Sequence, residues 1–212
     1  MALDLEEQEQ VAELKAWWTQ YGNLIISALT AALLVIAGWQ GWRWYERSQA
    51  AEAAMQYEAL AKAAQGGDAK AVRDAAGVLI ESYPRSLYAA MGALSAARFL
   101  YDHNDLKNAK AQLTWASENA RSDELRDLAR LRLATILLDE KAYDEALKLL
   151  DAKHVAAFDA QYAALRGDVL VAKNQPNDAR SAYRMALDRS DKDQGNAAFR
   201  DSVRMRLDAL GG

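Results

Sequence analysis

The amino-acid sequence predicts an all-α protein in which one N-terminal transmembrane helix is followed by a superhelix of repeated helices. Three observations support this fold class. Residues 16–42 contain no charged side chain, and the apolar residues beyond residue 47 recur at the spacing of helices. The chain of 212 residues also has only 2 prolines, and no segment alternates polar and apolar residues for long enough to form a strand.

Residues 1–16 form an acidic leader. Asp4, Glu6, Glu7, Glu9 and Glu13 stand there against one basic side chain, that of Lys15. A cleaved signal peptide would begin with a basic segment and continue with only about 7–15 apolar residues. Because this leader is acidic and the apolar segment after it is longer, we expect the N-terminal segment to be retained as a membrane anchor.

Residues 17–45 predict a transmembrane helix. The hydrocarbon core of a bilayer is about 30 Å thick and needs roughly 20 apolar residues in a helix. Residues 24–39 are apolar except for Ser27 and Thr30, whose hydroxyls can bond to carbonyls of the same helix. Aromatic side chains flank both ends, as they do at membrane interfaces: Trp17, Trp18 and Tyr21, then Trp39, Trp42, Trp44 and Tyr45. The alternative is a buried core helix, which gives no reason for aromatic residues at both ends.

The direction in which this helix crosses the membrane is not decided by charge. Lys15 and the amino terminus lie before the apolar segment, and Arg43 and Arg47 follow it. The positive-inside rule compares such residues and finds almost equal numbers here. From residue 43 to residue 65 no helix breaker occurs, so we expect the span to continue as one helix into the domain that follows.

The composition of the remaining chain excludes several classes of function. Residues 48–212 contain 23 Lys and Arg against 24 Asp and Glu, a net charge of −1. A nearly neutral domain without a basic stripe argues against binding to nucleic acid. The chain has no cysteine, which excludes disulfides, thiolate metal sites, cysteine nucleophiles and covalent haem attachment.

Small residues recur with a period that indicates helical repeats. Ala97 and Ala109 are followed after 37 residues by Ala134 and Ala146, and after 33 more by Gly167 and Ala179. This pattern is typical of tetratricopeptide repeats, in which small residues let paired helices cross closely. We therefore expect residues 46–212 to form a tetratricopeptide-like domain of about three and a half repeats. An ordinary helical bundle with chance spacing remains the alternative.

Two further predictions concern the first repeat and the C-terminal end of this domain. Leu60, Val72 and Pro84 occupy the repeat positions of the first unit, where Val72 departs from the usual alanine. A C-terminal capping helix is predicted from four apolar residues at helical spacing, and these are Phe199, Val203, Leu207 and Leu210.

No pattern of residues predicts catalysis, a metal site or a cofactor. The only histidines, His103 and His154, have no second metal ligand at helical spacing, and we interpret both as solvated surface residues. The carboxylates of residues 139–145 are paired as in glycosidases, but a hydrophilic turn between repeat helices explains them better. We expect a protein that is not an enzyme.

A second face of the repeat helices is the candidate binding site. In a tetratricopeptide superhelix this face lines the concave groove. It carries mostly apolar side chains, which suits an extended hydrophobic segment of a partner. The candidate groove residues are Tyr57, Met91, Leu94, Arg98, Tyr101, Leu128, Leu131, Thr135 and Leu138. The alternative, that this face is buried as core, stays open.

Four segments carry a resemblance to a known bacterial family. They are WWTQYGN (17–23), GWRWYE (41–46), FLYDHNDLKNAKAQL (99–113) and LARLRLATILLDEKAYDEALKLL (128–150). With the acidic leader and the absence of cysteine, the chain resembles the YfgM-type ancillary subunits of the SecYEG translocon. The resemblance implies a single-pass inner-membrane protein with a periplasmic helical domain. It also implies association with SecYEG, with a membrane-anchored periplasmic chaperone of prolyl-isomerase type, and with emerging exported proteins.

Two functions follow as hypotheses. The first is a membrane-tethered periplasmic binding scaffold that assists protein export at the Sec translocon by engaging a chaperone, emerging clients or both. The second is an anchored assembly or regulatory factor of another envelope machine, such as cell-wall synthesis or cytochrome maturation. The two hypotheses name different protein partners, so identifying the partners distinguishes them.

Overall fold

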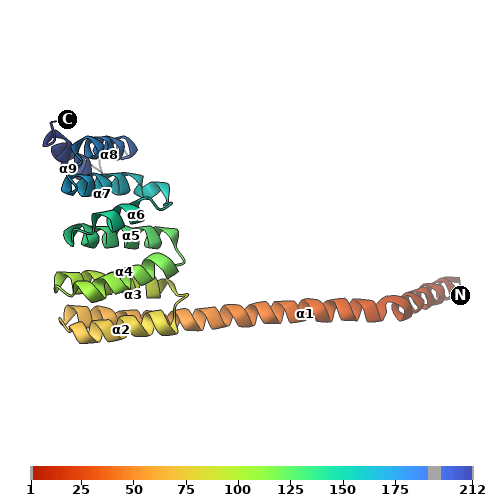
Figure 1. The fold of residues 1–212 in the computed structure, drawn as a ribbon. Coiled ribbons are helices and arrows are strands. Elements are labelled where there is room, and N and C mark those ends of the chain that lie inside the picture. The colour runs from red at the N-terminus through yellow and green to blue at the C-terminus, as the bar shows by residue number, and fades with distance from the viewer. Residues whose placement is uncertain (1, 191–196, 212) are drawn as a thin grey trace. The chain divides into compact units, whose positions relative to one another are not determined.

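The structure, a computed structural model, describes residues 2–190 and 197–211 (Figure 1). Every regular element within these residues is a helix, and the all-α prediction is confirmed. The chain divides into two compact units, Met1–Ser48 and Gln49–Gly212. Helix α1, Ala2–Gln65, contributes residues to both, and it is unbroken from residue 43 to residue 65 as expected.

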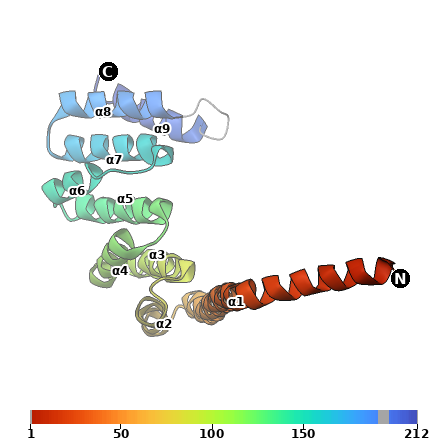
Figure 2. The same cartoon turned by 90° about the vertical axis from the view of Figure 1, so that its right-hand side faces the viewer.

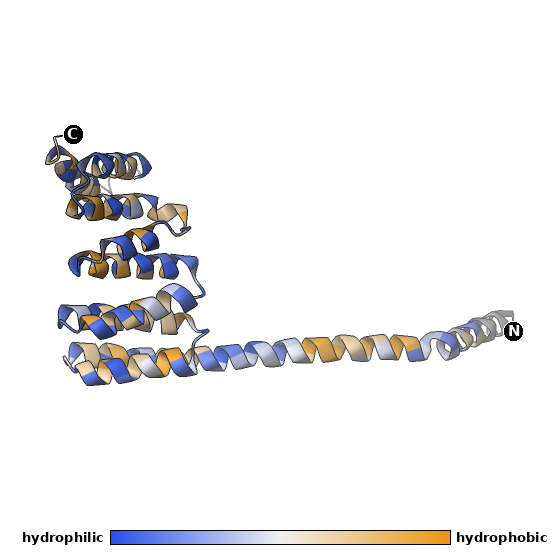
Figure 3. Cartoon of the chain, viewed as in Figure 1, coloured by the Kyte–Doolittle hydropathy of each residue, from blue (hydrophilic) through white to orange (hydrophobic). Residues whose placement is uncertain are grey.

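The first unit is the apolar part of α1. This helix has a segment with a mean hydropathy of 1.9, which is long and apolar enough to cross a membrane. The hydropathy colouring in Figure 3 shows this segment as an orange band on α1. Only 6% of the segment is buried, so the interpretation as a core helix of a globular protein does not hold. The Thr30 hydroxyl donates to the Ile26 carbonyl at 2.8 Å, which satisfies a polar group that lipid could not.

The aromatic residues at the two ends of this segment contact each other within each end. The rings of Trp17 and Tyr21 have centroids 5.8 Å apart, and those of Trp42 and Tyr45 are 6.5 Å apart. The Arg43 guanidinium lies 5.0 Å from the centre of the Trp39 ring, at cation–π distance. Amphipathic groups of this kind are typical of a helix that meets the headgroup layer at both ends.

The second unit is a stack of antiparallel helix pairs (Figures 1 and 2). Helix α3 pairs with α4, α5 with α6 and α7 with α8, and α9 lies against α8. The last turns of α1 share a hydrophobic cluster with α2, in which Leu60 is buried together with Val72 and Leu79. The bounds are α2 Ala69–Ser82, α3 Leu87–Asp102, α4 Leu106–Asn119, α5 Asp123–Asp139, α6 Tyr143–Leu150, the 3-10 helix η1 Ala156–Phe158, α7 Asp159–Ala172, α8 Pro176–Arg189 and α9 Ala197–Asp208.

The turn inside each helix pair has one residue in the left-handed backbone conformation, at an equivalent position in every repeat. Gly67, Asn104, Lys141 and Asn174 have φ angles of 73°, 61°, 64° and 59°, and they are spaced by the repeat periods inferred from the sequence. In each turn the next amide donates to a carbonyl five residues earlier, as from Asp105 N to Leu100 O at 2.8 Å. The first repeat has this turn as well, so the described residues contain four complete helix pairs rather than three and a half.

Small residues lie where the helices cross. The five predicted alanines at these places are at most 1% exposed, and Gly167 is buried too. A Cβ atom added at Gly167 would lie 2.4 Å from Cε1 of Tyr183 on the paired helix, closer than atoms can approach. Val72, which departs from the usual alanine, is also fully buried. The predicted crossing positions therefore face the core.

The last helix, α9, packs against the C-terminal end of the stack. Val203 of α9 is fully buried in a cluster with Ala179 and Tyr183 of α8. The Arg180 Nε atom donates to the Leu210 carbonyl at 2.9 Å, and Arg206 pairs with Asp168 at 2.8 Å. These contacts attach α9 to the two helices before it.

Replacing Gly167 by alanine tests the close crossing. We expect Gly167→Ala to lower the free energy of unfolding by about 1–3 kcal/mol, because the added methyl group would overlap the Tyr183 ring, which is only 2% exposed. Its hydroxyl is held at 2.8 Å by Asp168. Gly77→Ala is the matched control, since no atom lies within 4 Å of a Cβ there. Because alanine favours a helix interior, this control should raise stability by about 0.5–1 kcal/mol. Urea unfolding of the full chain in detergent measures both, and equal effects would contradict the proposed packing.

Lys141 offers a second test of the repeat turns. A side chain at φ 64° is unfavourable for an L-residue, and the other three turns use glycine or asparagine. Lys141→Gly should therefore raise the free energy of unfolding by roughly 0.5–1 kcal/mol. The same change at Lys148, within α6, should lower it by a similar amount, roughly 0.5–1 kcal/mol. Destabilisation by both changes in thermal melts would refute the turn assignment.

Candidate functional site

The nine candidate groove residues differ in how far they reach solvent. Arg98, Tyr101 and Thr135 are exposed. Partly buried are Tyr57, Met91, Leu128, Leu131 and Leu138. Leu94 is only 5% exposed and belongs to the hydrophobic core. The alternative left open by the sequence, a buried face, therefore applies to Leu94, and this side chain does not contribute a binding surface.

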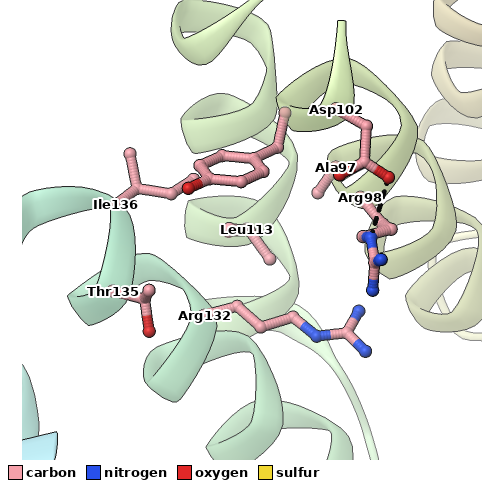
Figure 4. Close-up of a pocket in the computed structure, with 8 residues that line it drawn as sticks. Ala97, Arg98, Asp102, Leu113, Arg132, Thr135 and Ile136 are labelled. Carbon is pink, nitrogen blue, oxygen red and sulfur yellow. Dashed lines mark hydrogen bonds and ion pairs between the residues drawn. The ribbon is translucent and has the colours of Figure 1, made fainter. Parts of the chain in front are cut away.

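A pocket of about 270 Å³ lies between α3, α4 and α5 (Figure 4). Three of the nine candidate residues, Arg98, Tyr101 and Thr135, line it. The other polar lining residues are Asp102 and Arg132, and the apolar ones are Ala97, Leu113 and Ile136. Arg98 and Thr135 occupy equivalent places in consecutive repeats. The repeat geometry thus places both side chains in one pocket.

Most of the polar side chains of this pocket have partners within the chain. The Tyr101 hydroxyl donates to Asp139 Oδ2 at 2.8 Å. This hydrogen bond, and then the charge of Asp139, raises the pKa of the Tyr101 phenol above its usual value. The Arg98 Nε atom donates to Asp102 Oδ2 at 2.9 Å across one helical turn. The Thr135 hydroxyl donates to the Leu131 carbonyl at 3.0 Å.

Arg132 is held differently. Its Nη1 atom donates to the Leu94 carbonyl at 3.2 Å, and no carboxylate within residues 10–190 and 197–211 forms an ion pair with it. Figure 4 shows the side chain reaching from α5 toward Arg98. Burial, and after it the positive charge of Arg98, lowers the pKa of the Arg132 guanidinium. The pocket therefore holds one partly buried cation without an acidic partner.

The sequence interpretation missed Arg132. The candidate face was defined by residues at the positions i, i+3, i+7 and i+10, and Arg132 directly follows one of them. A basic residue inside the run 131–138, which is apolar apart from Arg132 and Thr135, was the available signal.

A second pocket, of about 210 Å³, lies near the loop that follows α6. The His154 ring stacks on Tyr162 with centroids 3.9 Å apart, and its Nε2 atom is 3.3 Å from Asp159. Arg189 pairs with the other oxygen of Asp159 at 3.1 Å. His154 is thus partly buried and packed, so its interpretation as a solvated surface residue was wrong. The charges of Arg189 and Asp159 compensate each other.

Asp127 explains why that loop is ordered. This carboxylate on α5 is 2% exposed and accepts from the Val155 amide and from Arg130, both at 2.8 Å. The Tyr162 hydroxyl donates to the Asp127 carbonyl at 3.1 Å. Burial raises the pKa of Tyr162 to about 12. A buried acid with three such contacts around it has a structural role. Among the residues that the structure describes, no group of three or more acidic residues and histidines is placed to hold a metal ion.

Comparison with known proteins agrees with this architecture. A family profile described as a tetratricopeptide repeat-like domain matches residues 15–212. The protein is therefore a tetratricopeptide-like helical-repeat protein, and the alternative of a bundle with chance spacing is excluded.

Individual relatives define the family more closely. A protein of Neisseria gonorrhoeae named "Ancillary SecYEG translocon subunit" is 31% identical over 211 residues, which are 99% of this chain and 100% of the relative. Proteins of the same name from Haemophilus influenzae and Escherichia coli are 27% and 26% identical over 210 and 204 residues. These matches cover 99% and 96% of this chain, and 100% and 96% of the relatives. The chain belongs to the family of ancillary SecYEG translocon subunits, as its sequence resemblance indicated.

Two substitutions separate core from surface within the candidate face. We expect Leu94→Ala to lower the free energy of unfolding by about 2–5 kcal/mol, because it leaves a cavity in a buried site. Thr135→Ala, at an exposed position of the pocket, should change it by less than about 0.5 kcal/mol. Circular dichroism during urea unfolding of the full chain gives both values. Comparable losses would mean that Thr135 is as deeply packed as Leu94.

Proposed function

We propose that this protein is a non-catalytic binding scaffold that is anchored in the bacterial inner membrane and works beside the Sec translocon. The observation that carries the proposal is the full-length match to proteins named as ancillary SecYEG translocon subunits. These matches include both the apolar segment and the helical repeats. A role confined to the repeats would not need the apolar helix.

The apolar segment of α1 serves as the anchor in this proposal, with residues 17–45 in the bilayer and the repeat domain in the periplasm. Its apolar side chains are exposed, and lipid is the environment that stabilises such a surface. Anchoring also strengthens weak contacts. A binding module that shares a membrane with its partner reaches an effective concentration of about millimolar when the connection is short.

The repeat domain supplies the binding surface. Its helices α3 and α5 present the pocket and partly exposed apolar side chains, including Met91, Leu128 and Leu131. An apolar surface with a few polar groups is suited to an extended segment of another protein. The occupants that this proposal names are segments of exported proteins that emerge from the channel, or a membrane-anchored periplasmic chaperone of prolyl-isomerase type.

Site-specific crosslinking in membranes tests this function. A photo-reactive amino acid at Leu131, on the proposed binding face, should give crosslinks to an exported protein arrested in the channel or to the chaperone. The same amino acid at Arg184, exposed on α8, is the control and should give few. Purification of SecYEG from solubilised membranes should recover the chain as well. Recovery instead with components of cell-wall synthesis or cytochrome maturation would replace the proposal by the second sequence hypothesis.

The orientation has its own test. With the domain in the periplasm, protease added to intact spheroplasts should digest the chain after residue 47. A cytoplasmic protein measured in the same sample controls for lysis. Protection of the domain until the membrane is broken would reverse the assigned orientation.

A further inference from the structure

We propose that the pocket between α3 and α5 binds a carboxylate of a partner polypeptide and that the Arg132 guanidinium is its principal ligand. The proposal rests on the proposed function, in which this face binds another protein. It goes further because it names the chemical group that the partner supplies and the side chain that receives it.

The first argument is that Arg132 lacks the partner that comparable residues have. A charge removed from water is unfavourable unless an opposite charge compensates it. Arg130, two residues earlier on the same helix, pairs with Asp127 at 2.8 Å. Arg73 and Lys110 in other repeats pair in the same way, with Asp105 at 3.2 Å and Glu140 at 2.6 Å. Arg180 and Arg200 form no ion pair among the described residues either, but each of them makes three hydrogen bonds to uncharged oxygen atoms. Arg132 has a single carbonyl at 3.2 Å.

The second argument is the sign of the charge around it. Arg98 contributes another guanidinium to the same pocket, and Asp102 at 2.9 Å neutralises it. The remaining charge among the lining residues is that of Arg132. Asp139 does not line the pocket and accepts a hydrogen bond from the Tyr101 hydroxyl at 2.8 Å. An incoming carboxylate would balance the pocket and would relieve the repulsion between the two arginines.

The third argument is the shape of the donor. A guanidinium presents several N–H groups in one plane, and a carboxylate can accept two of them at once. The bond from Nη1 to the Leu94 carbonyl uses one donor and fixes the side chain. The other N–H groups on Arg132 are free for a ligand, because no other hydrogen bond from this side chain is found within the described part of the chain.

The apolar lining defines the rest of the ligand. Ala97, Leu113 and Ile136 form the apolar part of the pocket beside Arg132. A carboxylate on a short apolar stem would place carbon atoms against these residues and oxygen atoms on the guanidinium. A glutamate side chain and the C-terminal residue of a polypeptide both have this form. Because the neighbouring surface on α3 and α5 is partly apolar, we assign the ligand to a polypeptide segment rather than to a free anion.

The experiment uses the full chain in lipid nanodiscs and three fluorescent peptides of one apolar sequence. The first has a central glutamate and an amidated C-terminus, and the second has glutamine in that place. The third is the glutamine peptide with a free C-terminal carboxylate. Fluorescence anisotropy at low salt gives the three affinities, and empty nanodiscs correct for binding to lipid.

We expect at least one carboxylate peptide to bind about tenfold more tightly than the amidated glutamine peptide, as for a charge-assisted hydrogen bond. The preferred peptide identifies the source of the carboxylate. Arg132→Gln should abolish the preference, Arg132→Lys should retain part of it, and the control Arg184→Gln should leave it unchanged. The preference should also weaken as salt is raised. Thermal melts establish that each variant is folded.

Three results would overturn the pocket proposal. They are equal affinities for the three peptides, a preference that survives in folded Arg132→Gln, and the absence of binding by every peptide. None of them decides the proposed function, because the crosslinking and purification experiments measure association with the translocon independently. Conversely, a carboxylate preference without association with SecYEG would refute the proposed function and keep the pocket.

Discussion

The fold of the domain depends on helices that pack closely enough for each pair to bury its apolar face on the next. A single helix pair cannot exclude water from that face, so the array is stable only as a stack. Small residues permit the approach, and the contact of Gly167 with the Tyr183 ring shows how little space remains. The left-handed residue in each turn reverses the chain within a few residues, which keeps the paired helices in register. A helix pair at an end of the stack has a neighbouring pair on one side only, and α9 covers one of these ends.

The elements that could be predicted are those that follow from composition and period. The apolar segment, the repeat spacing and the capping helix all come from apolar residues at fixed intervals, and the structure has each of them. The number of repeats was underestimated because Val72 is larger than the usual alanine. The backbone of Gly67 has the same left-handed conformation as the equivalent residues of the later turns, and this identifies the first repeat as a complete helix pair.

The candidate site was less predictable, because burial depends on neighbours that the period does not specify. Leu94 and Leu131 occupy equivalent places in successive repeats, yet Leu94 is in the core and Leu131 is partly exposed. Arg132 and His154 were missed or misjudged for the same reason. Their surroundings come from residues in other helices and loops, such as the Leu94 carbonyl and the Tyr162 ring.

The two buried or partly buried charges of Asp127 and Arg132 differ in how far other groups of the chain compensate them. Asp127 is more deeply buried than Arg132, but it is fully compensated by an arginine and a backbone amide, so its burial secures the loop after α6. Arg132 is compensated only by a carbonyl and stands beside another cation. A well-packed apolar residue at that place would make folding more favourable. Binding sites are expected at positions where the residue present is unfavourable for the stability of the fold. The unbalanced cation is therefore the basis of the proposal that an acidic group of a partner binds in this pocket.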